Sequence, residues 1–64
     1  MRQTLRTLAD IHEHCEDARI AEDDNPEHGF YVYAMHNGQR IEYFLYGKLG
    51  DPTAFIERRT VIAG

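Results

Sequence analysis

Hydrophobic residues recur at helical spacing through the first third of the chain. Intervals of three and four residues place five of them on one face of a helix with about 3.6 residues per turn. These residues are Leu5, Leu8, Ile11, Cys15 and Ala18. A proline-containing turn segment at residues 23–26 ends the pattern, and Thr4 is a suitable N-cap. The spacing predicts an amphipathic helix over residues 4–21.

The middle of the chain predicts a tight β-hairpin. Residues 29–36 and 39–46 are rich in aromatic and β-branched side chains, and they flank Asn37-Gly38, the preferred pair for a type I′ turn. Such a turn fixes the register, so alternate residues share a face. The face that we expect to pack on the helix carries Phe30, Val32, Ala34, Ile41, Tyr43 and Leu45. The opposite face carries Tyr31, Tyr33, Met35, Arg40, Glu42, Phe44 and Tyr46.

The C-terminal third has two interpretations. Asp51 is a good N-cap and Pro52 suits a first helical position, so the first is a short helix over residues 52–59. The second is a third strand over about residues 57–62. The predicted fold class is α+β in two layers. An N-terminal amphipathic helix packs on an antiparallel β-hairpin, and a short C-terminal helix or a third strand follows (αββα or αβββ).

The hairpin face that points away from the helix also has alternative interpretations. The C-terminal residues can fold back over it and complete an ordinary core. A second copy of the chain can cover it in a homodimer, which would relieve the marginal stability of so short a chain. A different protein can bind it, because Tyr, Phe, Met and Arg are enriched at interfaces. The candidate partner-binding residues on this face are Tyr31, Tyr33, Met35, Arg40, Phe44 and Tyr46.

Length and composition indicate one small domain. The 64 residues support a single domain, 1–64, and a chain of this length buries only ~60% of its unfolded surface. Cys15 is the only cysteine, which excludes an intramolecular disulfide and fits a reducing compartment. No apolar run has signal length or reaches the ~20 residues that span a bilayer. We therefore expect a cytoplasmic protein without membrane contact.

Acidic residues are concentrated in one segment. Eight of the eleven lie between Asp10 and Glu27, against a single base, Arg19. A second candidate partner-binding surface, on the acidic face of the predicted helix, consists of Asp10, Glu13, Asp17 and Asp24. Such a face is either solvated or docks on a basic partner surface, where complementary charge speeds association. Small phage or mobile-element proteins that block host or defence machinery often share this size and charge, although this is an analogy of class.

The sequence shows no catalytic, metal or cofactor motif. His12 and His14 are two residues apart, so on a helix they point in nearly opposite directions and cannot share an ion. Cys15 is flanked by carboxylates, an environment that disfavours a reactive thiolate. The glycines match neither of the Gly-rich phosphate-binding patterns. We expect no metal, no cofactor and no enzymatic activity.

Two classes of binding function are left. The first is a non-enzymatic protein-binding module that regulates or inhibits a partner by occupying its surface, or that serves as a small homodimeric accessory subunit. The second is a nucleic-acid-binding regulator that stacks nucleobases on the aromatic face and uses the basic residues Arg40, Lys48, Arg58 and Arg59. Nucleic-acid binding requires surrounding positive charge, and the hairpin supplies only Arg40 to that face, beside Glu42. The sequence therefore favours a protein partner.

Overall fold

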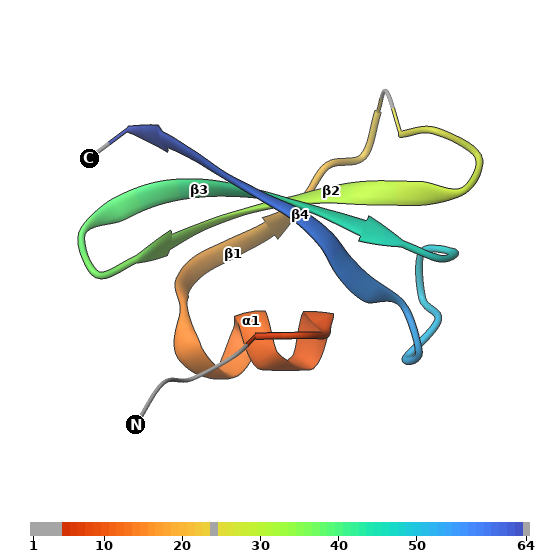
Figure 1. Cartoon of the computed structure of the whole chain (residues 1–64), viewed down its shortest axis with the longest axis horizontal. Helices are drawn as coiled ribbons and strands as arrows, with labels where there is room; N and C mark the ends of the chain where they lie inside the picture. The colour runs from red at the N-terminus through yellow and green to blue at the C-terminus, as the bar shows by residue number, and fades with distance from the viewer. Residues whose placement is uncertain (1–4, 24, 64) are drawn as a thin grey trace.

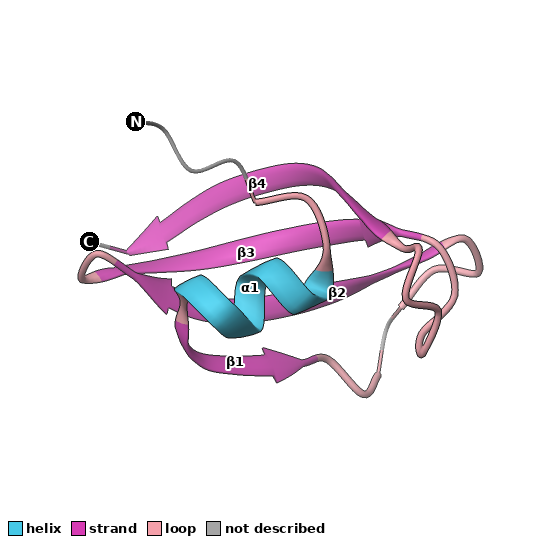
Figure 2. Cartoon of the chain, turned by 90° about the horizontal axis from the view of Figure 1, so that it is seen from below, coloured by secondary structure: helices cyan, strands magenta, loops and turns pink. Residues whose placement is uncertain are grey.

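The described part of the chain folds as a four-stranded antiparallel sheet with one short helix on one face. The computed structural model describes residues 5–23 and 25–63. Its elements are α1 (Leu8–His14), β1 (Glu16–Ile20), β2 (Gly29–His36), β3 (Gln39–Tyr46) and β4 (Phe55–Ala63). The strand order is β1-β2-β3-β4, so each strand pairs with its neighbour in sequence. In Figure 1 the helix lies below the sheet, and Figure 2 shows it from that side. The predicted fold class is wrong, because the sheet has four strands (αββββ) where a hairpin with one further element was expected.

The helix is much shorter than the predicted span of residues 4–21. It begins at a capping box, in which the Thr7 hydroxyl accepts from the Asp10 N–H at 3.3 Å and the Asp10 carboxylate accepts from the Thr7 N–H at 3.1 Å. It ends at Cys15, whose N–H donates to the Ile11 carbonyl at 2.8 Å. Thr4, the predicted cap, lies outside the described residues. The helix therefore covers only Leu8–His14.

The residues after the helix form β1, where the spacing predicted more helix. Arg19 lies opposite Tyr33, and Ile20 lies opposite Val32. Asp17 adopts a left-handed φ of 51°, and the register shifts at this point of the strand. A strand here supplies partners for the N–H and C=O groups along the edge of β2, which a continued helix would have left unpaired. Strand pairing therefore outweighed the helical periodicity, which is a weak preference in comparison.

The predicted hairpin register is confirmed. Strands β2 and β3 pair from Gly29 opposite Tyr46 to His36 opposite Gln39, with no shift along the way. Asn37 and Gly38 have φ values of 53° and 77°, as a type I′ turn requires at both central positions.

The predicted C-terminal helix over residues 52–59 is wrong. Asp51 makes only a single turn, in which its carboxylate accepts from the Thr53 N–H at 2.8 Å and its carbonyl accepts from the Ala54 N–H at 3.1 Å. The chain then extends as β4 and pairs with β3, where Phe55 lies opposite Tyr46. A run of β-branched residues at its end suits a strand. The alternative of a third strand was closer, although the strand begins two residues earlier and is the fourth.

The hydrophobic core lies between the sheet and α1. Its buried members are Ile11, Phe30, Val32, Ala34, Ile41, Tyr43, Leu45 and Ala54. Leu5, Leu8 and Cys15 are partly buried against it. This is the packing predicted for that face of the hairpin. Each fully buried large apolar side chain contributes about 1.5–3 kcal/mol. We call this side of the sheet the covered face.

Candidate binding surface

The opposite side of the sheet, which we call the open face, receives side chains from all four strands. The helix lies on the covered face, and the described loops lie at the ends of the strands (Figure 1 and Figure 2). The open face includes Arg19, Tyr31, Tyr33, Met35, Arg40, Glu42, Phe44, Tyr46, Phe55 and Arg58. The six residues predicted to bind a partner on this side are therefore brought together. The C-terminal residues extend the sheet and do not fold back over this face.

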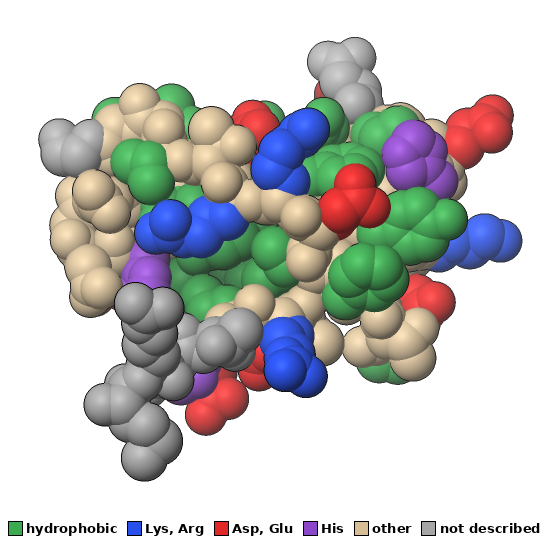
Figure 3. All heavy atoms as spheres, in the orientation of Figure 1, with side chains coloured by type: hydrophobic (Ala, Val, Ile, Leu, Met, Phe, Trp, Pro, Cys, Tyr) green, Lys and Arg blue, Asp and Glu red, His purple; other side chains and the backbone are tan. Residues whose placement is uncertain are grey.

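An aromatic cluster occupies one end of the open face. It consists of His28, Tyr31, Phe44, Tyr46 and Phe55, whose rings contact one another with centroids 5.0–5.9 Å apart. Tyr46 and Phe55 are 45% and 48% exposed, whereas Phe44 at the centre is only 5% exposed. In the orientation of Figure 1, hydrophobic side chains gather on the surface where β4 begins (Figure 3). Contacts within the cluster hold these rings in place, while Tyr46, Phe55 and His28 are still exposed to solvent.

Two members of the aromatic cluster, His28 and Phe55, were missed by the sequence reasoning. Phe55 was assigned to a helix, and it reaches the open face only because β4 pairs with β3. His28 precedes β2, and its ring lies 5.9 Å from Phe44 and 5.7 Å from Tyr46. The signal that could have found Phe55 is the β-branched run that follows it at residues 60–62. Nothing in the sequence points to His28.

The arginines of the open face come from three different strands. The hairpin alone contributes Arg40, whereas β1 adds Arg19 and β4 adds Arg58. The Arg58 guanidinium lies over the Phe44 ring, 5.6 Å from its centroid, in a cation–π contact. The sequence reasoning missed Arg19, which it placed on the predicted helix. It named Arg58 among the basic residues of the nucleic-acid alternative, but it placed this residue on a helix and not on the sheet. The open face therefore carries three arginines where the hairpin alone indicated one, and Glu16 and Asp17 of β1 add carboxylates beside them.

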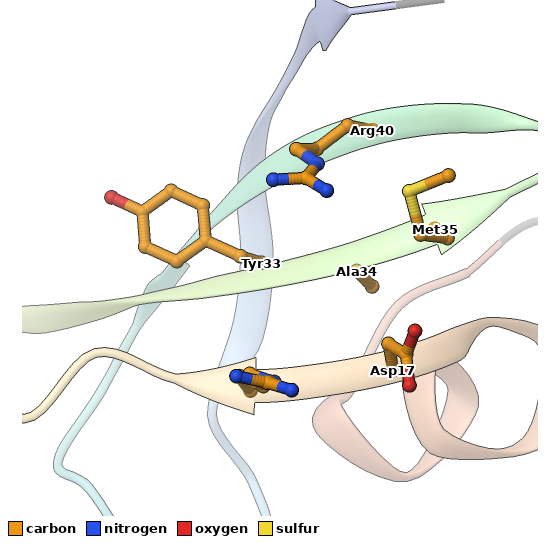
Figure 4. Close-up of a pocket in the computed structure, with 6 residues that line it drawn as sticks. Asp17, Tyr33, Ala34, Met35 and Arg40 are labelled. Atoms are coloured by element: carbon orange, nitrogen blue, oxygen red, sulfur yellow. The ribbon is translucent and has the colours of Figure 1, made fainter.

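A pocket of about 210 Å³ lies at the other end of the open face, toward the Asn37-Gly38 turn. It is lined by Asp17, Arg19, Tyr33, Ala34, Met35 and Arg40. Figure 4 shows Asp17 on β1 and Arg40 on β3, on either side of the β2 segment that carries Tyr33 and Met35. We call it the two-arginine pocket. Positive and negative side chains from separate strands thus meet in one hollow.

The predicted acidic helix face is not formed. Asp10 and Glu13 lie on α1, but Asp17 lies in β1 and lines the two-arginine pocket. Asp24 lies outside the described residues. Asp10 is occupied by helix capping, and hydrogen bonds from the backbone N–H groups of Arg6 and Thr7 lower the pKa of its carboxyl. The short helix removes the geometric basis for docking a basic partner on a continuous acidic stripe.

Cys15 contacts the covered face and not the open one. Its sulfur lies 3.6 Å from the hydroxyl of Tyr43, within hydrogen-bond range for sulfur. Burial raises the pKa of Tyr43 to about 12, and the hydrogen bond with Cys15 acts in the same direction. Among residues 5–23 and 25–63, no group of three or more His, Cys, Asp and Glu side chains is placed to hold a metal ion. Cys15 and Tyr43 therefore contact each other in the core between the helix and the sheet.

A second hollow, mostly apolar, lies on the helix side. It measures about 670 Å³ and runs between α1, β1 and the loop before β4. Leu8, Ala18, Ile20 and Leu49 supply its apolar walls. It exists because a helix of seven residues does not reach across the full width of the sheet. Most of its walls belong to the covered side, and Arg19 at the edge of the sheet lines both this hollow and the two-arginine pocket.

Comparison with protein-family models, curated protein sequences and solved structures finds no significant match to this chain. In the part of the chain that the structure describes, no helix has the length and apolar character needed to span a bilayer. The function proposed below is therefore argued from the geometry of this molecule alone.

Proposed function

We propose that the protein is a small non-enzymatic binding module that regulates or inhibits a partner protein by occupying its surface with the open face. One observation carries this proposal: the C-terminal residues become the edge strand β4 and add Phe55 and Arg58 to the open face. A chain of this length has no other described element large enough to form a third layer. The exposed aromatic surface is then available for a partner.

The composition of the open face supports a protein partner. Tyr33, Tyr46 and Phe55 are each 38–48% exposed and lie on a rigid sheet. Aromatic residues, Met and Arg are the types that contribute most to protein interfaces. Neighbouring strands and ring contacts already fix these side chains. Binding a partner would therefore cost this protein little side-chain entropy. The open face therefore has both the composition and the rigidity of an interaction surface.

The partner can be a second copy of the chain or a different protein. A homodimer would bury aromatic surface and add stability that so short a chain lacks. The setting that we propose is the cytoplasm, where the single thiol of Cys15 would stay reduced. The module would act through contact alone, with no metal or cofactor.

Single-stranded nucleic acid is a second candidate partner, and a specific observation favours it. The open face carries Arg19, Arg40 and Arg58 around its aromatic side chains, where the hairpin had indicated only one arginine. Arginines and stacked rings together are the requirement for binding single strands. Glu42 lies opposite Tyr33 and Glu16 opposite Met35, so carboxylates interrupt the path that a phosphate backbone would follow. This charge balance makes a protein partner the better fit.

The test combines partner capture and mass measurement on matched variants. A double variant, Tyr46→Ser and Phe55→Ser, removes two exposed rings of the aromatic cluster. We expect it to stay folded by far-UV circular dichroism and to lose a partner that the wild-type chain captures from extract of its native cell. If the partner is a second copy, light scattering should show a dimer that becomes a monomer in the variant.

The matched control removes exposed hydrophobic surface elsewhere. Leu49 is 57% exposed and lies on the helix side, so Leu49→Ser should leave capture and mass unchanged. Equal loss of the partner in both variants would contradict a role for the open face. Unfolding of the double variant would show that these rings serve stability, which would also overturn the proposal.

A further inference from the structure

The two-arginine pocket places two guanidinium groups on either side of one strand. Arg19 lies opposite Tyr33 on the β1 side of β2, and Arg40 lies opposite Met35 on the β3 side. Tyr33 and Met35 are two residues apart, so the two arginines lie diagonally across β2, and both side chains line the same pocket. The pocket, at about 210 Å³, has room for a small functional group and none for a large ligand.

The charge of the pocket selects the kind of anion. Arg19 and Arg40 contribute two positive charges, and Asp17 on the same wall contributes one negative charge. The net charge of these three side chains is therefore one positive charge, which matches a bound group with a single negative charge. A carboxylate carries that charge, whereas a phosphate monoester carries about −1.5 to −2 near neutral pH and would meet Asp17 at close range. The carboxylates of Glu16 and Glu42 on the same face add to this discrimination.

We infer that the two-arginine pocket is an anion subsite of the open face and that it takes the carboxylate of an acidic side chain from the partner protein. This inference rests on the proposed function. The guanidinium groups would bind the carboxylate with paired N–H···O hydrogen bonds. Tyr33 and Met35 line the same pocket and would pack against the apolar stem of the acidic side chain. The partner segment is therefore acidic at this end and apolar where it meets the aromatic cluster.

The position of Asp17 provides a variant that should strengthen binding. Its φ of 51° is left-handed, a conformation that Asn also adopts readily. Asp17→Asn keeps the shape of the pocket and removes its negative charge. A subsite for carboxylates should therefore bind them more tightly in this variant, whereas a purely structural role for the arginines predicts no gain.

The experiment is an NMR titration of the full chain with short blocked peptides. The probe is acetyl-Leu-Glu-Leu-amide, and acetyl-Leu-Gln-Leu-amide is its uncharged match. We expect the Glu peptide to shift the amide signals of Tyr33 and Met35 and to bind at least about 10-fold more tightly than the Gln peptide, as charge-assisted hydrogen bonds require. Arg40→Gln should lower the affinity for the Glu peptide about 10-fold, and Asp17→Asn should raise it several-fold.

Arg58→Gln is the matched control, because Arg58 lies on the open face but over Phe44 and outside the pocket. It should change the affinity by less than about 2-fold. Equal binding of the Glu and Gln peptides, or equal effects of Arg40→Gln and Arg58→Gln, would overturn the inference. Tighter arginine-dependent binding of inorganic phosphate or of an eight-residue oligothymidylate would also overturn it and would assign the pocket to phosphate.

The results also separate this inference from the proposed function. Suppose that the Tyr46→Ser and Phe55→Ser variant loses the partner and Arg40→Gln retains it. This result would reject the anion subsite and support the role of the open face in partner binding. Suppose instead that the Glu peptide binds in the pocket but no captured partner depends on Tyr46 and Phe55. This result would support the anion subsite and reject the proposed function of the open face.

Discussion

The covered and open faces of the sheet carry similar aromatic residues, but the open face buries Phe44 and leaves most of the rings around it exposed. On the covered face Phe30 and Tyr43 are 2% and 1% exposed, whereas on the open face Tyr46 and Phe55 are 45% and 48% exposed. Aromatic side chains therefore do not identify the core of this protein by themselves. The position of a seven-residue helix, α1, decides which face becomes the core.

The difference follows from how much chain is available to cover each face. About half of the described residues are used to build the sheet, and α1 with the segment before it covers one side. A chain of 64 residues has little left for a third layer. The covered face thus stabilises the fold, and the open face keeps rings that contact one another and solvent. Substitutions of neighbouring residues on the two faces can test this division.

The largest contrast is expected between Leu45→Ala and Tyr46→Ala. Leu45 is fully buried on the covered face, so its truncation should cost about 2–5 kcal/mol. A domain of this size has a total stability of roughly 3–10 kcal/mol, so this variant should be largely unfolded at moderate temperature. Tyr46→Ala removes one exposed ring and its ring contacts, at a cost of about 1 kcal/mol. Urea unfolding followed by circular dichroism measures both, and similar costs would contradict the assignment of the faces.

Gly29→Ala should have the next largest effect, because the added Cβ would meet both a ring of the open face and the backbone of β3. An added Cβ would collide with the Phe44 ring and come within 2.5 Å of the Leu45 carbonyl oxygen. We expect a loss of about 1–3 kcal/mol as the backbone and the aromatic cluster shift. Gly50→Ala is the control, since its Cβ meets nothing within 4 Å and its φ of 91° leaves only conformational strain. Thermal unfolding of the two variants should rank Gly29→Ala as the more damaging.

Tyr43→Phe should have the smallest effect at neutral pH and a distinct one in alkali. Loss of the hydroxyl removes the contact with Cys15, at about 1 kcal/mol. The folded pKa of Tyr43, about 12, lies above its ordinary value of 10.0, so folding favours the neutral phenol. Its contribution to stability is fully present below pH 10 and is lost as the pH rises from 10 to 12. Urea unfolding across this range should show a steeper loss for the wild type than for Tyr43→Phe, and parallel curves would argue against burial as the cause.

Much of the open face could be predicted because the hairpin depends on local chemistry. Asn37-Gly38 fixes the turn, the turn fixes the register, and the register sorts Tyr31, Tyr33 and Met35 away from the helix. The arginines of β1 and β4 could not be placed in this way. Arg19 and Arg58 belong to segments whose local patterns suited a helix, and they reach the open face only by pairing with β2 and β3. The two-arginine pocket therefore required the tertiary structure.

The sequence by itself determined the hairpin, its register and the side of it that packs on Ile11, because turn chemistry and alternation act between residues that are close along the chain. Tertiary structure decided that residues 16–20 became a strand, and it selected the strand over the helix that the sequence also allowed after Asp51. Leu8–His14 stayed helical because the Thr7–Asp10 capping box starts a helix there, while the exposed edges of β2 and β3 supplied unpaired backbone groups for β1 and β4. Hydrogen bonding along those edges involves residues far apart in sequence, so a local pattern such as the β-branched run at residues 60–62 can favour a strand but cannot specify its partner.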